Sequence, residues 1–124
     1  MMRTKTILSS MVAAGLLALG LRVAHAQDPA VVNANTIKVK LENDRVRVLE
    51  ATLPPGAKEQ PHSHPAYVIY VIDGGKTRNH AADGKTAEIE FKAGDVIYRD
   101  AIPTHWAENI GTTTIHLILV EIKK

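Results

Sequence analysis

Cysteine is absent from the 124 residues of the sequence. The chain therefore has no disulfide framework, and it lacks the cysteine to which a lipid anchor would be attached. Its stability has to come from a hydrophobic core and from any metal that it binds. A chain of this length can bury such a core without covalent cross-links.

An apolar run long enough to cross a membrane is also absent. The longest apolar stretch, residues 7–21, falls short of the roughly 18 residues that a spanning helix needs. Arg3 and Lys5 precede this stretch, and Ala24-His25-Ala26 follows it as a small-x-small cleavage site, a combination typical of a secretory signal peptide. We expect cleavage after this site to remove residues 1–26 and to leave a secreted or periplasmic protein without a membrane anchor.

A large excess of positive charge is the third feature that the mature chain lacks. The full sequence has 15 basic and 13 acidic residues, but three of the basic residues and none of the acidic ones lie in the predicted signal peptide. Removal of the signal leaves a net charge of −1 with histidine counted as neutral. The charge therefore gives no support for nucleic-acid binding, and the expected partners are small molecules.

No segment has a sustained helical period. Residues 27–35 are polar and contain Pro29, so we expect a flexible N-terminal arm there. From residue 36 onward, short β-prone runs alternate with turn signals such as Pro54-Pro55-Gly56. The predicted strands span residues 37–41, 46–53, 60–64, 67–72, 76–80, 87–92, 96–99, 105–109 and 113–122. This pattern predicts an all-β fold in one domain, residues 36–124, built as a small β-barrel or a double-sheet jelly roll.

Three histidines carry the strongest indication of function. One residue separates His62 from His64, and His105 lies far downstream. Alternate residues of a strand point to the same side, so the first two imidazoles can be directed at one point. Imidazole suits zinc, iron, copper and nickel, and three protein ligands with an open position are typical of a reactive metal site. We predict a metal site made of His62, His64 and His105; taken alone, the first two also fit a surface turn.

The spacing of these residues resembles the first sequence motif of the cupin family. That motif has a glycine, five residues, His-x-His and a later glycine, and the matching positions here are Gly56, His62, His64 and Gly74 or Gly75. The glutamate that usually follows His-x-His after three or four residues is missing, because Val68 and Ile69 stand there.

The second cupin motif is matched at its ends. Gly94, His105 and Asn109 fall at their usual places, whereas Asp100 and Ile102 occupy positions where a proline and a glycine are usual. The resemblance extends from about Thr36 to Lys123 and so covers nearly all of the predicted mature chain.

This resemblance implies a double-stranded β-helix fold and one divalent metal held by His62, His64 and His105. The ligand set looks like that of the cupin non-haem iron dioxygenases, which favours Fe(II); Mn, Ni, Cu and Zn remain alternatives. The implied function is that of an oxidoreductase acting on a small chelating substrate. The alternatives are a non-catalytic module that binds a metal or a small ligand, and a barrel that has lost its metal. No catalytic acid or base is evident, so the catalytic residues stay unknown.

Several polar residues near the two motifs are further candidates. Gln60 shares the predicted face of His62 and His64, Glu59 lies one residue off that face, and Glu108 alternates away from His105. We expect all three to be surface groups, with water in place of the missing glutamate. Arg99 is the one cation near the second motif that could meet an anionic substrate, and a surface role fits it equally well.

The remaining histidines and aromatic residues have less specific expectations. We expect His80 to be solvated and His116 to be buried with a hydrogen bond to the backbone. Tyr67, Tyr70, Tyr98 and Trp106 could supply pocket walls, but core or rim positions are the expected ones. The apolar run 115–120 could form the seam of a possible homodimer.

Overall fold

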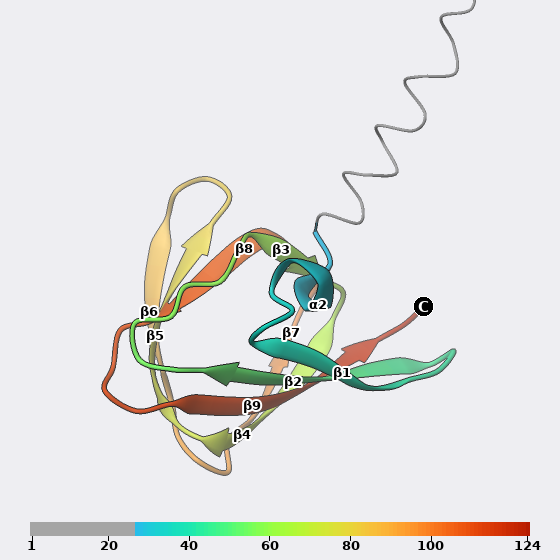
Figure 1. Ribbon diagram of the computed structural model, residues 1–124. Coiled ribbons are helices and arrows are strands. Elements are labelled where there is room, and N and C mark those ends of the chain that lie inside the picture. Colours follow the sequence, from blue (N-terminus) through green and yellow to red (C-terminus); the bar gives the residue numbers. More distant parts are fainter. Residues whose placement is uncertain (1–26) are drawn as a thin grey trace, which may run out of the picture.

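The computed structural model describes residues 27–124, so the predicted signal peptide lies outside the described residues. This part of the chain forms two antiparallel β-sheets that face each other, with one short helix at one end (Figure 1). The elements are α2 (Pro29–Val32), β1 (Ile37–Glu42), β2 (Val46–Leu53), β3 (His62–His64), β4 (Tyr67–Asp73), β5 (Gly75–Ala81), β6 (Thr86–Phe91), β7 (Val96–Arg99), β8 (Ile102–Asn109) and β9 (Ile115–Ile122).

The strands are divided between a five-stranded sheet, in the order β1-β2-β9-β4-β7, and a four-stranded sheet, in the order β3-β8-β5-β6. Neighbours in sequence such as β3 and β4 belong to opposite sheets, which is the connectivity of a double-sheet jelly roll. The predicted all-β architecture is confirmed, and the two sheets stay separate rather than closing into one continuous barrel.

All nine predicted strands are present, and their ends differ from the predicted ones by at most three residues. Strand prediction succeeds here because glycine-containing turns punctuate the chain. Gly56 and Gly94, which open the two motifs, have φ angles of 78° and 88°, a region that other residues rarely adopt.

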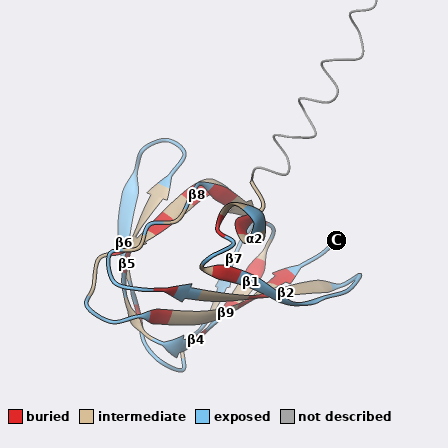
Figure 2. Ribbon diagram, in the orientation of Figure 1, coloured by how far each residue is buried: buried red, intermediate tan, exposed pale blue. Residues whose placement is uncertain are grey.

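The core lies between the two sheets, and its buried residues are the red segments of the strands in Figure 2. β9 shows the alternation clearly, because Ile115 and Leu119 are buried in the core and Leu117 packs against it. Leu49 on β2 and Ile69 on β4 complete the same layer. Burial of this apolar surface is the main force that holds the sheets together.

Residues 27–35 contain a helical turn instead of the predicted flexible arm. The Asp28 side chain caps this turn by accepting a hydrogen bond from the Ala30 amide at 2.9 Å, and Pro29 occupies the first turn. Both are favoured residues at these positions. The turn contacts β1 and β3, and Asn33 after it is buried. A turn of four residues is too short to produce a helical period, which is why the sequence pattern missed it.

No helix within residues 27–124 combines the length and the apolar character needed to cross a membrane.

The assignment of the core predicts different costs for two leucine substitutions in the five-stranded sheet. Leu49 is fully buried and Leu41 is 49% exposed. Leu49→Ala should lower the free energy of unfolding by about 2–5 kcal/mol because it leaves a cavity. Leu41→Ala should change it by less than about 0.5 kcal/mol. Urea denaturation of both variants measures the difference, and equal losses would contradict this core.

Candidate metal centre

The three histidines predicted from the sequence meet on the inner face of the four-stranded sheet. His62 and His64 lie on β3, and His62 stands directly opposite His105 on β8. All three side chains are buried, and each offers a ring nitrogen that lies within 4.8 Å of those of the other two. The register shifts between His62 and His64, a local irregularity of the kind found where strands direct side chains at a site.

The orientation of His62 is fixed by the backbone of Gln60. The His62 Nδ1 atom lies 2.8 Å from the Gln60 carbonyl oxygen, which only accepts, so Nδ1 carries the proton and Nε2 is left free. Asn33 holds this carbonyl and the neighbouring amide in place. Its Oδ1 atom accepts from the Gln60 amide at 2.7 Å, and its Nδ2 atom donates to the Gln60 carbonyl at 3.2 Å.

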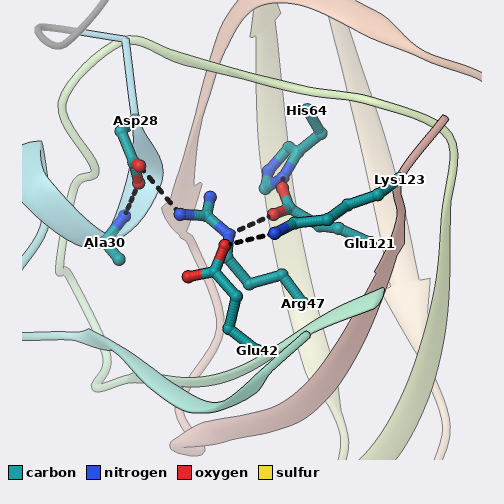
Figure 3. A network of polar contacts seen from close by, with 7 residues as sticks. All are labelled: Asp28, Ala30, Glu42, Arg47, His64, Glu121 and Lys123. Atoms are coloured by element: carbon teal, nitrogen blue, oxygen red, sulfur yellow. Dashed lines mark hydrogen bonds and ion pairs between the residues drawn. The ribbon is translucent and has the colours of Figure 1, made fainter. Parts of the chain in front are cut away.

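His64 is anchored by a network of hydrogen bonds and ion pairs that includes Glu121, Arg47 and Asp28 (Figure 3). Its Nδ1 atom donates to Glu121 Oε2 at 2.8 Å, and Arg47 Nε donates to Glu121 Oε1 at 2.6 Å. Arg47 Nη1 then donates to Asp28 Oδ2 at 2.8 Å. A carboxylate on the outer nitrogen of a histidine is the usual device for fixing its ring and raising its basicity toward a metal.

Hydrogen bonds within this network, together with the positive charge of Arg47, stabilise the ionised form of Glu121. Burial alone would raise the pKa of Glu121, but hydrogen bonds from His64 and Arg47 outweigh it and hold the pKa below its ordinary value. Burial likewise opposes the charge on Arg47, and the hydrogen bonds to Asp28 and Glu121 reverse that effect and raise the pKa of the guanidinium.

His105 has no such support from the protein. Both of its ring nitrogens are buried, and neither has a hydrogen-bond partner among residues 27–124. Buried polar atoms without partners are rare and costly. The His105 ring therefore indicates that a group from outside the polypeptide bonds to one of its nitrogens.

The imidazoles of His62 and His105 are held in the neutral state that a metal requires. Burial lowers the pKa of His62 to about 4, and burial together with the neighbouring His62 and His64 lowers the pKa of His105 to about 3. Neutral rings, free inward nitrogens and the unpartnered His105 fit a divalent transition metal held by three nitrogen ligands. Such a set leaves coordination positions for water or a substrate.

An apolar cavity of about 80 Å³ adjoins the histidines, between the two sheets. Its aliphatic walls come from both sheets and include Ile37, Leu53, Ile69, Ile89, Ile115 and Leu119. Ile69, which four residues separate from His64, fills part of the wall, so the position of the missing motif glutamate is apolar in this chain. The polar residues of the lining include Glu59, Tyr67 and Arg99.

The prediction that Glu59 is a surface group is wrong, because its side chain lines the cavity. Its Oε1 atom accepts from the Ala107 amide at 3.0 Å. Burial raises the pKa of Glu59 to about 7, although the hydrogen bond from Ala107 acts against the shift. The prediction assumed a regular strand from residue 60. In the structure β3 begins at His62, and the preceding segment bends so that Glu59 faces inward.

The structure places the other candidates away from the cavity. Gln60 is exposed and contributes its backbone, while Glu108 points outward as predicted and pairs with Arg78 at 3.2 Å. His80 is not solvated, because it stacks on Trp106 with ring centroids 3.6 Å apart. His116 is half-buried and pairs with the Glu50 side chain at 3.1 Å, rather than with the backbone.

The aromatic candidates divide between the cavity and the surface. Tyr67 is buried and lines the cavity, and burial raises the pKa of its hydroxyl. Tyr70 and Tyr98 are exposed on the outer face of the five-stranded sheet.

Sequence reasoning missed Glu121 and Asn33, which position two of the histidines. Glu121 carried a readable signal, because it continues the inward alternation of residues 115, 117 and 119 in an otherwise apolar strand. An acidic residue at an inward position needs a buried partner. Asn33 carried no comparable signal, since its role depends on the short helical turn.

The anchoring of His64 predicts an effect of Glu121→Gln on metal affinity. This substitution keeps the shape of the side chain but removes the charge that supports the ring, so Zn²⁺ affinity should fall by about 10–100-fold. Glu108→Gln, which removes an outward carboxylate, should leave the affinity unchanged. Competition with a chromophoric chelator measures both, and an equal effect of the two substitutions would refute the role of Glu121.

The lowered histidine pKa values predict that acid destabilises the metal-free protein. His62 and His105 titrate near 4 and 3 in the folded protein and near 6.5 when unfolded. Below pH 6.5 the unfolded chain therefore binds protons that the folded chain does not. Stability should fall by up to roughly 1.4 kcal/mol per pH unit for each histidine. Glu59 acts in the opposite sense between pH 4.5 and about 7, because the folded protein keeps its proton there.

Urea unfolding in the presence of a chelator, at several pH values between 7.5 and 4.5, measures this dependence. We expect His105→Gln to make the loss of stability on acidification shallower and Glu59→Gln to make it steeper. Parallel curves for the wild type and both variants would show that these groups do not control the acid sensitivity.

The fold and the site agree with the comparisons to known proteins. The sequence profile of the cupin domain matches residues 49–121, more than half of the chain. A cupin domain from Bordetella pertussis superposes with a TM-score of 0.65 at 26% identity, covering 71% of this chain and 92% of that chain. No match was found among curated proteins.

Two further solved structures are similar. A Klebsiella pneumoniae protein with a double-stranded β-helix domain has a TM-score of 0.56 at 25% identity, covering 68% of this chain and 73% of that one. A predicted oxalate decarboxylase from Thermotoga maritima has a TM-score of 0.53 at 27% identity, covering 71% and 79% of the two chains. With the profile match over most of its β-sheets and the histidine cluster at the expected motif positions, the chain belongs to the cupin family.

Proposed function

We propose that this cupin is a metal-dependent dioxygenase that binds Fe(II) through His62, His64 and His105 and oxidises a small chelating substrate. The observation that carries the proposal is the convergence of three buried histidine side chains, without a carboxylate ligand, at the side of an apolar cavity. Three neutral ligands leave the full positive charge on the metal and leave positions for a bidentate substrate and for oxygen. When bound, Fe(II) supplies Lewis acidity and the redox chemistry that oxygen activation requires.

The residues around the cavity favour an anionic head group. Arg99 lines the cavity together with the histidines and can pair with a negatively charged oxygen of the substrate. Arg99 is itself exposed, so this contact lies near solvent and adds orientation more than affinity.

Glu59 is the group in the lining best suited to move a proton. A carboxyl whose pKa is about 7 is divided between its acid and base forms at neutral pH. It can accept a proton from a substrate hydroxyl as the substrate becomes a chelating anion. Tyr67, with its raised pKa, stays a neutral hydroxyl and can donate a hydrogen bond.

The second candidate function is a non-catalytic module that captures a metal or a small ligand. The lean architecture favours this alternative, because residues 27–124 add no lid insertion to the two sheets. The similarity to a predicted oxalate decarboxylase adds oxalate, a small chelating dianion, to the substrates worth testing.

We further propose that the protein acts after export, in the periplasm or outside the cell. Support comes from the pattern of residues 1–26, with its positive start, apolar middle and small-x-small end.

Metal analysis of the purified protein tests the site directly. Protein made without a chelator or an affinity tag should contain about one equivalent of a redox-active divalent metal. The His62→Ala/His64→Ala double variant should lose it. The His80→Ala/His116→Ala double variant removes two histidines outside the site and should keep it. A metal content that is the same in both double variants would refute the assignment.

Oxygen consumption then separates the enzyme from the binding module. We expect the Fe(II)-loaded protein to consume oxygen with at least one compound among acetylacetone, cysteine, a flavonol and oxalate, and the double variant at His62 and His64 to consume none. Iron binding without oxygen uptake for any of these compounds would favour the module.

A further inference from the structure

The inner face of the four-stranded sheet carries a second set of polar groups, further into the cavity than the histidines. Thr77 on β5 is 3% exposed, lines the cavity, and has an Oγ1 atom without a hydrogen-bond partner among residues 27–124. Asn79, two residues along the same strand, is half-buried and also lines the cavity. Glu59 uses Oε1 for the Ala107 amide, and its Oε2 accepts from no described residue.

The strand register arranges these groups in line with the histidines. Ala81 on β5 lies opposite His105 on β8, Asn79 lies opposite Ala107, and Thr77 lies opposite Asn109. Each step of two residues advances along the strand by nearly 7 Å, so Thr77 lies roughly 13 Å from His105 along the sheet. Glu59 joins the middle of this row because it is hydrogen-bonded to Ala107.

The facing wall of the cavity is mostly aliphatic, and its polar members Tyr67 and Arg99, which are paired across β4 and β7, lie at the histidine end, where the Tyr67 ring is 4.6 Å from that of His64. Ile69, Leu117 and Leu119 come from the five-stranded sheet. A molecule that fills the cavity therefore meets hydrogen-bonding groups on one side and hydrocarbon on the other. A buried hydroxyl without a partner, such as that of Thr77, is costly unless a ligand satisfies it.

We propose that Thr77, with Asn79 and Glu59, recognises a hydroxyl or carbonyl group on the body of a substrate whose chelating head is held at His62, His64 and His105. This inference rests on the proposed metal-binding function and specifies its substrate class. The substrate is a slender molecule whose head group chelates the metal through two oxygen atoms. It has a hydrocarbon face and carries a hydroxyl or carbonyl group at the far end. Thr77 acts as a specificity-determining residue.

A matched pair of synthetic chelators tests the proposal. The 1-(3-hydroxypropyl) and 1-butyl derivatives of 3-hydroxy-2-methyl-4-pyridinone share one chelating head and differ only in a terminal hydroxyl in place of a methyl group. We expect Co²⁺-loaded wild-type protein to bind the hydroxypropyl compound at least about tenfold more tightly, because a site built to bond a hydroxyl discriminates strongly against its absence. Spectroscopic titration of the bound Co²⁺ measures both affinities without turnover.

Substitutions at Thr77 then assign the preference to its hydroxyl group. Thr77→Val keeps the shape of the side chain and should reduce the ratio of the two affinities to about one or reverse it. Thr77→Ser retains a hydroxyl and should keep the preference. Thr113→Val is the control, since the Thr113 hydroxyl donates to the Gly74 carbonyl outside the cavity, and it should leave the ratio unchanged.

Thermal unfolding of the chelator-treated protein gives a readout that does not depend on the metal. If the Thr77 hydroxyl has no partner in the free protein, Thr77→Val should raise Tm by a few degrees. Thr113→Val removes a satisfied hydroxyl and should lower Tm.

The outcomes separate this inference from the proposed function. If wild-type protein and Thr77→Val both bind Co²⁺ and show the same ratio of hydroxypropyl to butyl chelator affinity, the inference is overturned. The proposed metal site is not affected by that result. A fall in Tm for Thr77→Val also overturns the inference, because the hydroxyl then has a structural partner. A wild-type protein that binds no metal overturns both.

Discussion

The chain of charged hydrogen bonds from Asp28 through Arg47 and Glu121 to His64 is the interaction on which the site depends. Glu121 is 2% exposed, and a carboxylate buried to this extent is tolerated only when donors satisfy both of its oxygens. The donors come from β2 and β3, and Asp28 adds the cap of α2. One buried charge therefore holds four segments in register, and the ligand geometry follows from that register.

The two faces of the cavity are divided by chemistry. The four-stranded sheet contributes His62, His64 and His105 together with Thr77 and Asn79, whereas the five-stranded sheet contributes mostly aliphatic side chains. Because of this division, the apolar side chains pack as a core on one face. The polar row on the other face includes atoms of Thr77 and His105 that have no hydrogen-bond partner among the described residues. Departures from the rules of packing and hydrogen bonding are expected where a structure is built to bind something else.

The sequence was sufficient to predict the strands, the sheet architecture and the three histidines, because each rests on local information. Strand alternation and turn residues determine which side chains share a face, and the places of His62, His64 and His105 within two cupin-like motifs indicated the cluster. Glu59 and Asn33 were out of reach, because their roles depend on a bend before β3 and on a helical turn too short to leave a period. Long-range pairing decided both, and no local pattern encodes it.

β9 lies between β2 and β4 in the five-stranded sheet, although it follows both of them along the chain. During synthesis, the first eight strands are made before the strand that joins the two halves of this sheet exists. Glu121 arrives with that strand, so His64 has no anchor until synthesis has passed residue 121. A fold dominated by such distant pairings forms slowly and late. The anchored geometry of His64 is therefore among the last parts of the site to form.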